Sequence, residues 1–242
     1  MANRLSHRVA GKGMREGPVE LLLQQPSLLW RPILELFLWV FAASVLPGKS
    51  ILLLHGTITV LVLNCAPLRG LQLLLIQLVL LNLNRDLSGG FASSGGLHLA
   101  SSIILFVRCL TQASLRVFLV RDGLTRWMLM VSPLFLLYQT LSSTYPMLSA
   151  LKVTTYFSFV IMVLTLTRWS FSRNRFELFR WYMGCIVFII LSSLVLLPTN
   201  IGYSFDGILF NGILSHPNMI GVWLGVGVSW LVAISLNRPQ IS

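Results

Sequence analysis

The feature that most constrains this chain is a series of long apolar runs separated by short connectors. A helix needs roughly 20 apolar residues to cross a bilayer core of about 30 Å, and eight runs approach that length. They are Leu28–Leu46, Ser50–Asn64, Leu68–Asn84, Leu97–Leu119, Trp127–Ser142, Leu148–Thr167, Trp181–Leu197 and Pro217–Leu236. The pattern predicts an all-α fold, a polytopic transmembrane bundle of about eight helices.

Composition supports a membrane protein over a nucleic-acid-binding protein. The chain is 55% hydrophobic and 10% charged, whereas a soluble domain carries about 25% charged residues. The net charge of +11 comes from basic residues placed between apolar runs, as the positive-inside rule describes. The predicted partner is therefore the lipid bilayer, and no nucleic acid is expected.

The distribution of basic residues predicts the topology. With the N-terminus inside, thirteen of the 18 Lys and Arg residues fall in cytoplasmic segments, and Lys49, Arg85 and Lys152 fall outside. This excess predicts eight spans with both termini in the cytoplasm. Residues 1–27 then form a basic cytoplasmic tail, residues 28–242 the transmembrane domain, and residues 198–216 an outer loop before the last span.

Arg108 is the most unusual residue within a run, because it falls near the middle of the fourth. Gln112 and Arg116 follow at one-turn spacing, so a continuous helix would place all three on one polar stripe. A charge at the bilayer centre costs about 3 kcal/mol or more, which favours a protein interior or an aqueous cleft. The alternative is a shifted helix whose arginines extend to the inner surface.

A second candidate site is residues 210–218, named here the HPN segment, with the sequence Phe210-Asn211-Gly212-Ile213-Leu214-Ser215-His216-Pro217-Asn218. Proline is favoured in a first helical turn, and Ser215 and His216 are the candidate caps. A helix N-terminus attracts anions such as phosphate. Asn218 adds an amide donor, and a histidine can exchange a proton near neutral pH. The alternative is a capped helix start with an interfacial histidine.

No metal or cofactor site is predicted. Cys65, Cys109 and Cys185 are isolated in or near apolar runs and show neither metal spacing nor a disulfide framework. No Gly-rich phosphate loop or Ser/His/Asp arrangement is visible. The small residues Gly221, Gly225, Gly227 and Ser229 give the last span a small-residue face, which predicts close helix packing.

The HPN segment, continued by Met219-Ile220-Gly221, resembles the signature of the O-antigen ligase and polymerase superfamily. Those proteins commonly show Arg-Gly-x-x-x-His/Asn-Pro-Asn-x-hydrophobic-Gly/Ala at a periplasmic helix start, and Ser149-Ala150-Leu151-Lys152 is similar in character to the family's Ser-x-x-Lys. The resemblance implies a polytopic glycosyltransferase of the bacterial inner membrane. It would transfer or polymerise glycan from a polyprenyl-diphosphate donor at the outer face, without metal or cofactor.

The resemblance implies that Arg108, Asn211, His216 and Asn218 bind the diphosphate, while the catalytic base is left unassigned. Asn211 stands where the family often has Arg, so this position supplies only a neutral donor. The family's large outer loop and later helices are expected beyond Ser242, which implies an N-terminal portion or a truncated protein.

Two other functions fit the same sequence. One is a transporter or flippase-like protein for an anionic solute or lipid, with the arginines along its pathway. The other is a non-catalytic subunit that pairs with a separate C-terminal half or with other envelope assembly proteins.

Overall fold

The computed structural model describes residues 27–46, 50–84, 87, 95–121, 123–173, 177–203 and 209–236. Within these ranges the regular structure is helical, apart from isolated β-bridges such as Tyr203 with Phe210. The predicted tail, residues 1–27, lies outside the described residues except for the backbone of Ser27. The expectation of an all-α fold is confirmed.

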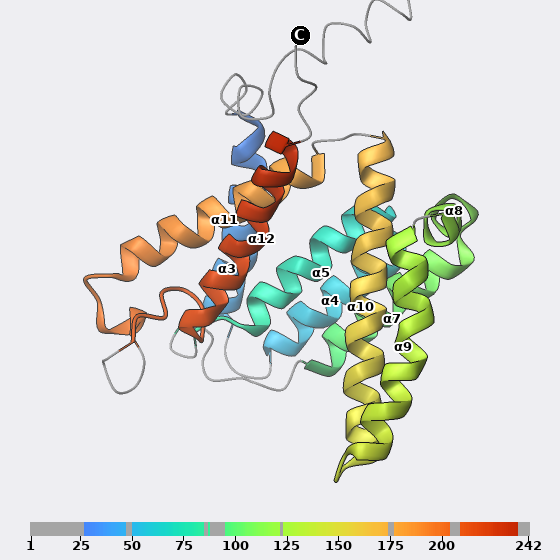
Figure 1. Cartoon of the computed structure of the whole chain (residues 1–242). Coiled ribbons are helices and arrows are strands. Elements are labelled where there is room, and N and C mark those ends of the chain that lie inside the picture. Colours follow the sequence, from blue (N-terminus) through green and yellow to red (C-terminus); the bar gives the residue numbers. More distant parts are fainter. Residues whose placement is uncertain are drawn as a thin grey trace, which may run out of the picture. The chain divides into compact units, whose positions relative to one another are not determined.

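The eight runs predicted from the sequence are all helical (Figure 1). The α-helices are α3 (Ser27–Val45), α4 (Ser50–Asn64), α5 (Pro67–Leu81), α7 (Gly95–Thr111), α8 (Ala113–Arg121), α9 (Gly123–Ser142), α10 (Pro146–Arg173), α11 (Glu177–Leu196) and α12 (Pro217–Leu236), and η1 (Asn200–Gly202) is a 3₁₀ turn. Two of them, α4 and α12, have the predicted bounds.

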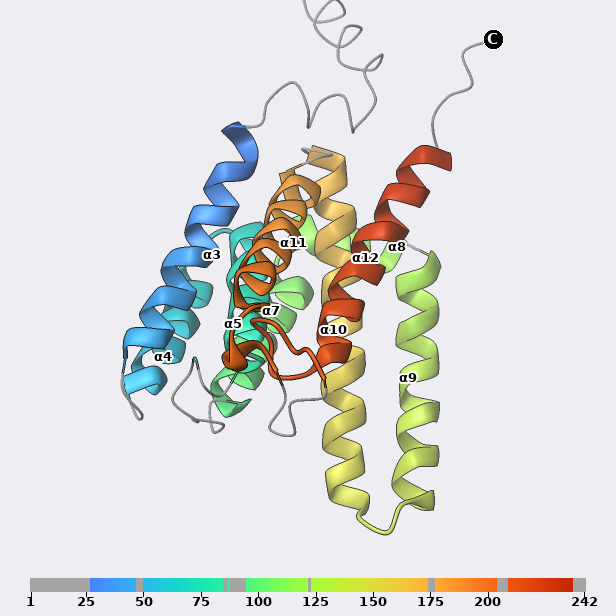
Figure 2. The ribbon, with the colours of Figure 1, turned by 90° about the vertical axis from the view of Figure 1, so that its left-hand side faces the viewer.

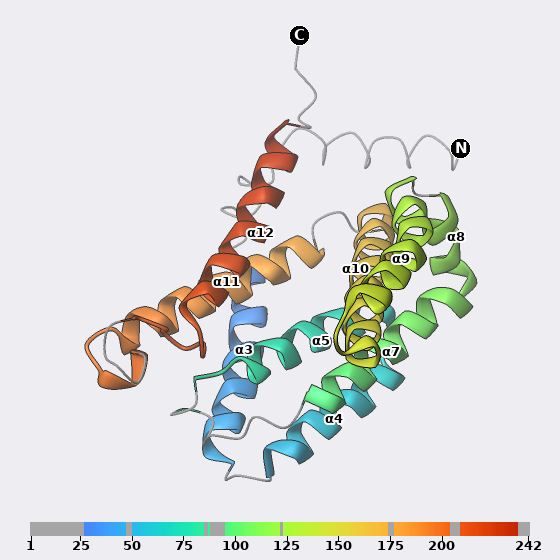
Figure 3. The same cartoon turned by 60° about the horizontal axis from the view of Figure 1, so that its bottom comes forward.

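The fourth run is two helices and not one, which corrects the prediction. The chain bends by 84° between α7 and α8 (Figure 3). The Gln112 N–H still donates to the Arg108 carbonyl at 2.9 Å, and the Gln112 carbonyl accepts from Leu115 and Arg116 at 3.0 and 2.9 Å. Gln112 thus closes α7 and opens α8. Because of this bend, Arg108 and Arg116 do not share one helical stripe.

Two of the described helices are long and apolar enough to cross a membrane, namely Pro146–Ser170 within α10, and α11. The number rises to three if the bent pair α7 and α8 counts as one span. Helices α4 and α5 have 15 residues each, or about 22 Å at 1.5 Å per residue, which is shorter than the bilayer core. The two or three longer apolar helices support membrane association by their length and composition.

The chain forms two compact units, of which the first joins the part up to Leu38 with the part from Phe179 onward. A β-carbon at Gly184 of α11 would collide with the Pro32 ring of α3. The Tyr182 ring stacks on Trp223 of α12 with centroids 5.1 Å apart, and its hydroxyl donates to the Trp223 carbonyl at 3.1 Å. Helix α11 therefore contacts both α3 and α12.

The second unit, Trp39–Leu178, has α5 as its most buried helix. Leu71, Leu74 and Ile76 are almost fully buried, and α5 packs against α4 and α7. A β-carbon at Gly70 would lie 2.6 Å from Leu105 Cδ2 of α7, so the missing side chain permits the close approach.

Helices α9 and α10 form a long antiparallel hairpin in the same unit (Figure 2). Phe135 and Phe157 meet edge to face with centroids 5.7 Å apart. At the turn, the Ser149 hydroxyl donates to the Ser143 hydroxyl at 2.6 Å. Ser149 of the Ser-x-x-Lys sequence therefore serves the hairpin turn.

Candidate functional site: the HPN segment and the start of helix α12

The HPN segment begins with a tight turn held by one carbonyl. The N–H groups of Asn211 and Gly212 both donate to the Gly202 carbonyl oxygen, at 2.8 and 3.0 Å. Gly212 has φ 61°, a left-handed conformation that residues with a β-carbon adopt at a cost. This turn explains why the sequence has glycine at position 212.

Two further contacts fix the segment on α11 and η1. Tyr203 and Phe210 form an antiparallel bridge, and their rings meet edge to face with centroids 5.3 Å apart. The Ile213 N–H donates to the Ser193 hydroxyl of α11 at 3.1 Å. Ile213 and Leu214 are buried, so the middle of the HPN segment anchors it by apolar burial.

His216 caps α12. Its Nδ1 accepts a hydrogen bond from the Asn218 N–H at 3.3 Å, and its carbonyl accepts from Met219 at 3.0 Å. Pro217 occupies the first helical position, where its missing N–H costs nothing. Of the two candidate caps, His216 takes the role, and Ser215 is exposed.

The cap changes what a ligand would meet at this helix start. The N–H groups of Asn218 and Met219, which were expected to face an anion, are already bonded to His216. The side chains of His216 and Asn218 are exposed. When Nδ1 accepts, a neutral imidazole carries its proton on Nε2. The groups open to a ligand are therefore His216 Nε2–H and the Asn218 amide.

Asn211 lies inside the first unit, not on its surface. Its side chain is 8% exposed, and its Oδ1 is buried without a hydrogen-bond partner among the described residues. A buried acceptor left unpaired costs about 1–3 kcal/mol. Only a donor group that reaches this interior position would satisfy it.

Arg108 belongs to the second unit, and the HPN segment belongs to the first. It lies in the last turn of α7 and is half-buried. Its Nη1 donates to the Val62 carbonyl at 3.0 Å, and the Cys65 thiol approaches the same oxygen at 3.8 Å. The final carbonyls of a helix have no partner within it. Arg108 therefore satisfies the C-terminal end of α4.

The described pocket in the second unit does not include the arginines. It has a volume of about 160 Å³ and lies between α7, α9 and α10, against Phe106, Pro133 and Phe157. Its polar lining consists of hydroxyl side chains, namely Ser132, Thr154 and Ser158. In the described part of the chain, no group of three or more His, Cys, Asp or Glu residues is placed to hold a metal.

Sequence reasoning did not single out Ser193, Gly202 or Tyr182. Ser193 and Gly202 hold the HPN segment through long-range hydrogen bonds, and Tyr182 joins α11 to α12. A buried serine inside an apolar run is a weak signal, because helical serines commonly bond their own backbone. Gly202 acts through its backbone carbonyl, and no pattern of residue types in the sequence indicates that role.

Comparison with known protein families, with curated proteins and with solved structures gave no match for this chain.

Proposed function

We propose that the chain is a bacterial inner-membrane protein of surface-polysaccharide assembly. It would transfer or polymerise glycan from a polyprenyl-diphosphate donor at the outer face. One observation carries the proposal: the turn at Gly212 and the cap at His216 hold a helix start at which the His216 and Asn218 side chains are exposed. That arrangement accompanies the HPN sequence that resembles the ligase and polymerase superfamily.

Glycan transfer from a polyprenyl diphosphate requires hydrogen-bond donors at the diphosphate leaving group, since negative charge develops there in the transition state. The His216 imidazole and the Asn218 amide supply two neutral donors beside the positive end of the α12 dipole. The Asn211 side chain is buried and does not join this surface. We assign the start of α12 to one wall of the donor site and assign no base within the described residues.

The proposal includes the topology of eight spans with both termini in the cytoplasm, which places the HPN segment outside. The distribution of Lys and Arg supports it. Reporter fusions at Arg175 and Asp206 test it: Arg175 should report the cytoplasm and Asp206 the periplasm. A cytoplasmic signal at Asp206 would remove the outward donor site.

Gene deletion followed by glycan and lipopolysaccharide profiling tests the function. We expect a loss of glycan ligation or a change in chain length, restored by the wild-type gene. His216→Ala and Asn218→Ala should fail to restore it, whereas Ser215→Ala, another exposed residue of the HPN segment, should succeed. An unchanged glycan profile with altered solute uptake would instead indicate a transporter.

A second candidate function is a non-catalytic subunit that pairs with a separate C-terminal half. The exposed apolar side chains Val222, Val226 and Val228 of α12 favour it, as does the open space beside Gly221 and Gly225. Co-purification with the product of the adjacent downstream reading frame tests this candidate. Full glycan activity of the chain reconstituted alone would argue against it.

A further inference from the structure

Helix α8 has two apolar faces, and only one of them is used inside the protein. Leu115 and Leu119 are buried in the interior of the second unit, where α8 packs against α7, α9 and α10. Val117 and Val120 are 46% and 55% exposed. At about 100° per residue, these two valines lie on the side opposite the buried leucines. The outer face of α8 is therefore apolar along its centre.

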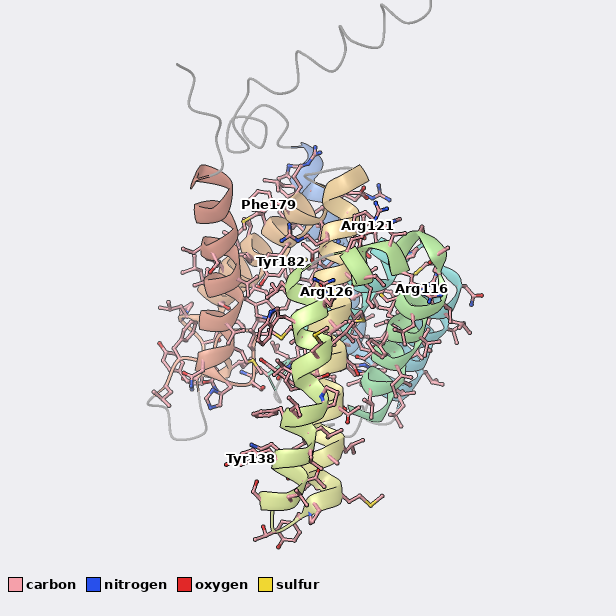
Figure 4. All side chains as sticks on the ribbon, turned by 45° about the vertical axis from the view of Figure 1, so that its right-hand side comes forward. Arg116, Arg121, Arg126, Tyr138, Phe179 and Tyr182 are labelled. Atoms are coloured by element: carbon pink, nitrogen blue, oxygen red, sulfur yellow. The ribbon has the colours of Figure 1, made fainter. Side chains whose placement is uncertain are left out.

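Arginines border this outer face on both sides. Arg116 and Arg121 are exposed, and the helical period places each of them roughly 70° from its centre, on opposite sides. Arg126, in the first turn of α9, is exposed too. Figure 4 shows the three arginines at the end of the second unit where α8 lies. None of the three guanidinium groups has a hydrogen-bond or ion-pair partner among the described residues.

The orientation of α8 matches the surface of a bilayer. Helix α7 has 17 residues, close to the shortest length that crosses a bilayer core, and α8 leaves it at 84°. If α7 crosses the membrane, α8 runs nearly in the membrane plane. Leu124 and Trp127, at the start of α9, are 49% and 69% exposed, and tryptophan favours this interfacial depth.

We propose that α8 is a helix lying in the membrane plane that binds anionic phospholipid headgroups. It would lie on the side of the membrane where most of the chain's Lys and Arg residues are placed. Val117 and Val120 enter the upper acyl region, and Arg116 and Arg121 reach phosphates on either side. Arg126 adds a third cation. The single acid of this stretch, Asp122, lies outside the described residues and leaves a net positive charge. The inference rests on α7 crossing the membrane and does not depend on the proposed glycan function.

A lipid titration of the full chain tests the headgroup preference. The purified protein in detergent is titrated with phosphatidylglycerol and, separately, phosphatidylcholine, and bound lipid is counted by native mass spectrometry. Each arginine near an anionic surface contributes roughly a fivefold gain in affinity. We expect Arg116→Gln with Arg121→Gln to weaken phosphatidylglycerol binding by roughly tenfold or more. Arg116→Lys with Arg121→Lys should largely retain it.

Lys152→Gln is the matched control, because Lys152 is an exposed cation in the first turns of α10, away from α8. It should bind both lipids as the wild type does. Circular dichroism and monodispersity in detergent confirm that the variants fold. Equal phosphatidylglycerol binding by the wild type and the double Gln variant overturns the proposal.

A depth measurement keeps the wild-type arginines in place. Val120→Cys in a Cys65→Ser background carries a spin label, since Cys109 and Cys185 are buried. In vesicles containing phosphatidylglycerol, the label should collide with oxygen more than with a water-soluble nickel chelate. Preferential collision with the chelate would place α8 in water. A label protected from both would indicate a protein partner, and either result overturns the proposal.

Discussion

Arg108 of α7 donates a hydrogen bond from Nη1 to the Val62 carbonyl of α4, 3.0 Å away. Val62 lies in the last turn of α4, whose final carbonyls have no partner within their own helix. The positive charge also faces the negative end of the α4 dipole. The only charged side chain of α7 thus joins two helix ends.

Arg108→Leu should destabilise the protein, because it leaves the Val62 carbonyl without its charged donor. We expect a loss of about 1–3 kcal/mol, read as a lower thermal unfolding midpoint in detergent. Arg116→Leu is the control, since the Arg116 side chain is exposed and its guanidinium group has no partner in the described structure. Its effect should stay within about 0.5 kcal/mol. Wild-type stability of Arg108→Leu would show that the contact does not support the fold.

Two substitutions at His216 distinguish its role as a helix cap from a role in binding the glycan donor. His216→Ala removes the acceptor for the Asn218 N–H and should cost about 1 kcal/mol. His216→Asn places a strong capping residue at the same position and should restore the unfolding midpoint. If the imidazole also serves the glycan donor, His216→Asn will fold but fail to restore the glycan profile. Restoration of both would reduce His216 to a cap.

Gly212→Ala should strain the turn that opens the HPN segment, because a β-carbon at φ 61° costs about 1 kcal/mol or more. The unfolding midpoint should fall, and glycan restoration should weaken if the turn positions the start of α12. Gly221→Ala provides the comparison, since a β-carbon there meets nothing within 4 Å. It should be neutral, or stabilising by up to about 1 kcal/mol. Equal effects at the two glycines would contradict the role given to the turn.

Gly70 and Gly56 form a matched pair for packing in the second unit. A β-carbon at Gly70 would lie 2.6 Å from Leu105 Cδ2, whereas one at Gly56 meets nothing within 4 Å. Gly70→Leu overpacks the contact between α5 and α7 and should cost about 1–3 kcal/mol. Gly56→Leu should leave the unfolding midpoint near that of the wild type. The reverse order would mean that α5 and α7 are not in close contact.

The helix positions were predictable because local chemistry marks their ends. Pro217 starts α12 where its missing N–H is harmless, and the polar Ser50 and Asn64 bound α4. The break at Gln112 was missed because no proline or glycine marks it. The spacing of Arg108, Gln112 and Arg116 fits a polar stripe on one helix. It fits equally well a membrane helix that ends and turns along the surface.

The chemistry of the HPN segment was only partly visible in the sequence. The cap by His216 follows from neighbouring residues, and the prediction of a cap there is confirmed. The burial of Asn211 and the bond from Ile213 to Ser193 depend on how residues far apart in the chain come together. Periodicity and motif spacing contain no such information.

The contact between Tyr203 and Phe210 lies at the two ends of the stretch that leads from η1 into the HPN segment. The bridge and the ring contact join the two residues at its ends. The Gly202 carbonyl, which precedes Tyr203, accepts the hydrogen bonds from Asn211 and Gly212, which follow Phe210. Residues gained or lost between Tyr203 and Phe210 would leave those hydrogen bonds in place. The start of α12 therefore depends on the residues that flank this stretch and not on the number of residues within it.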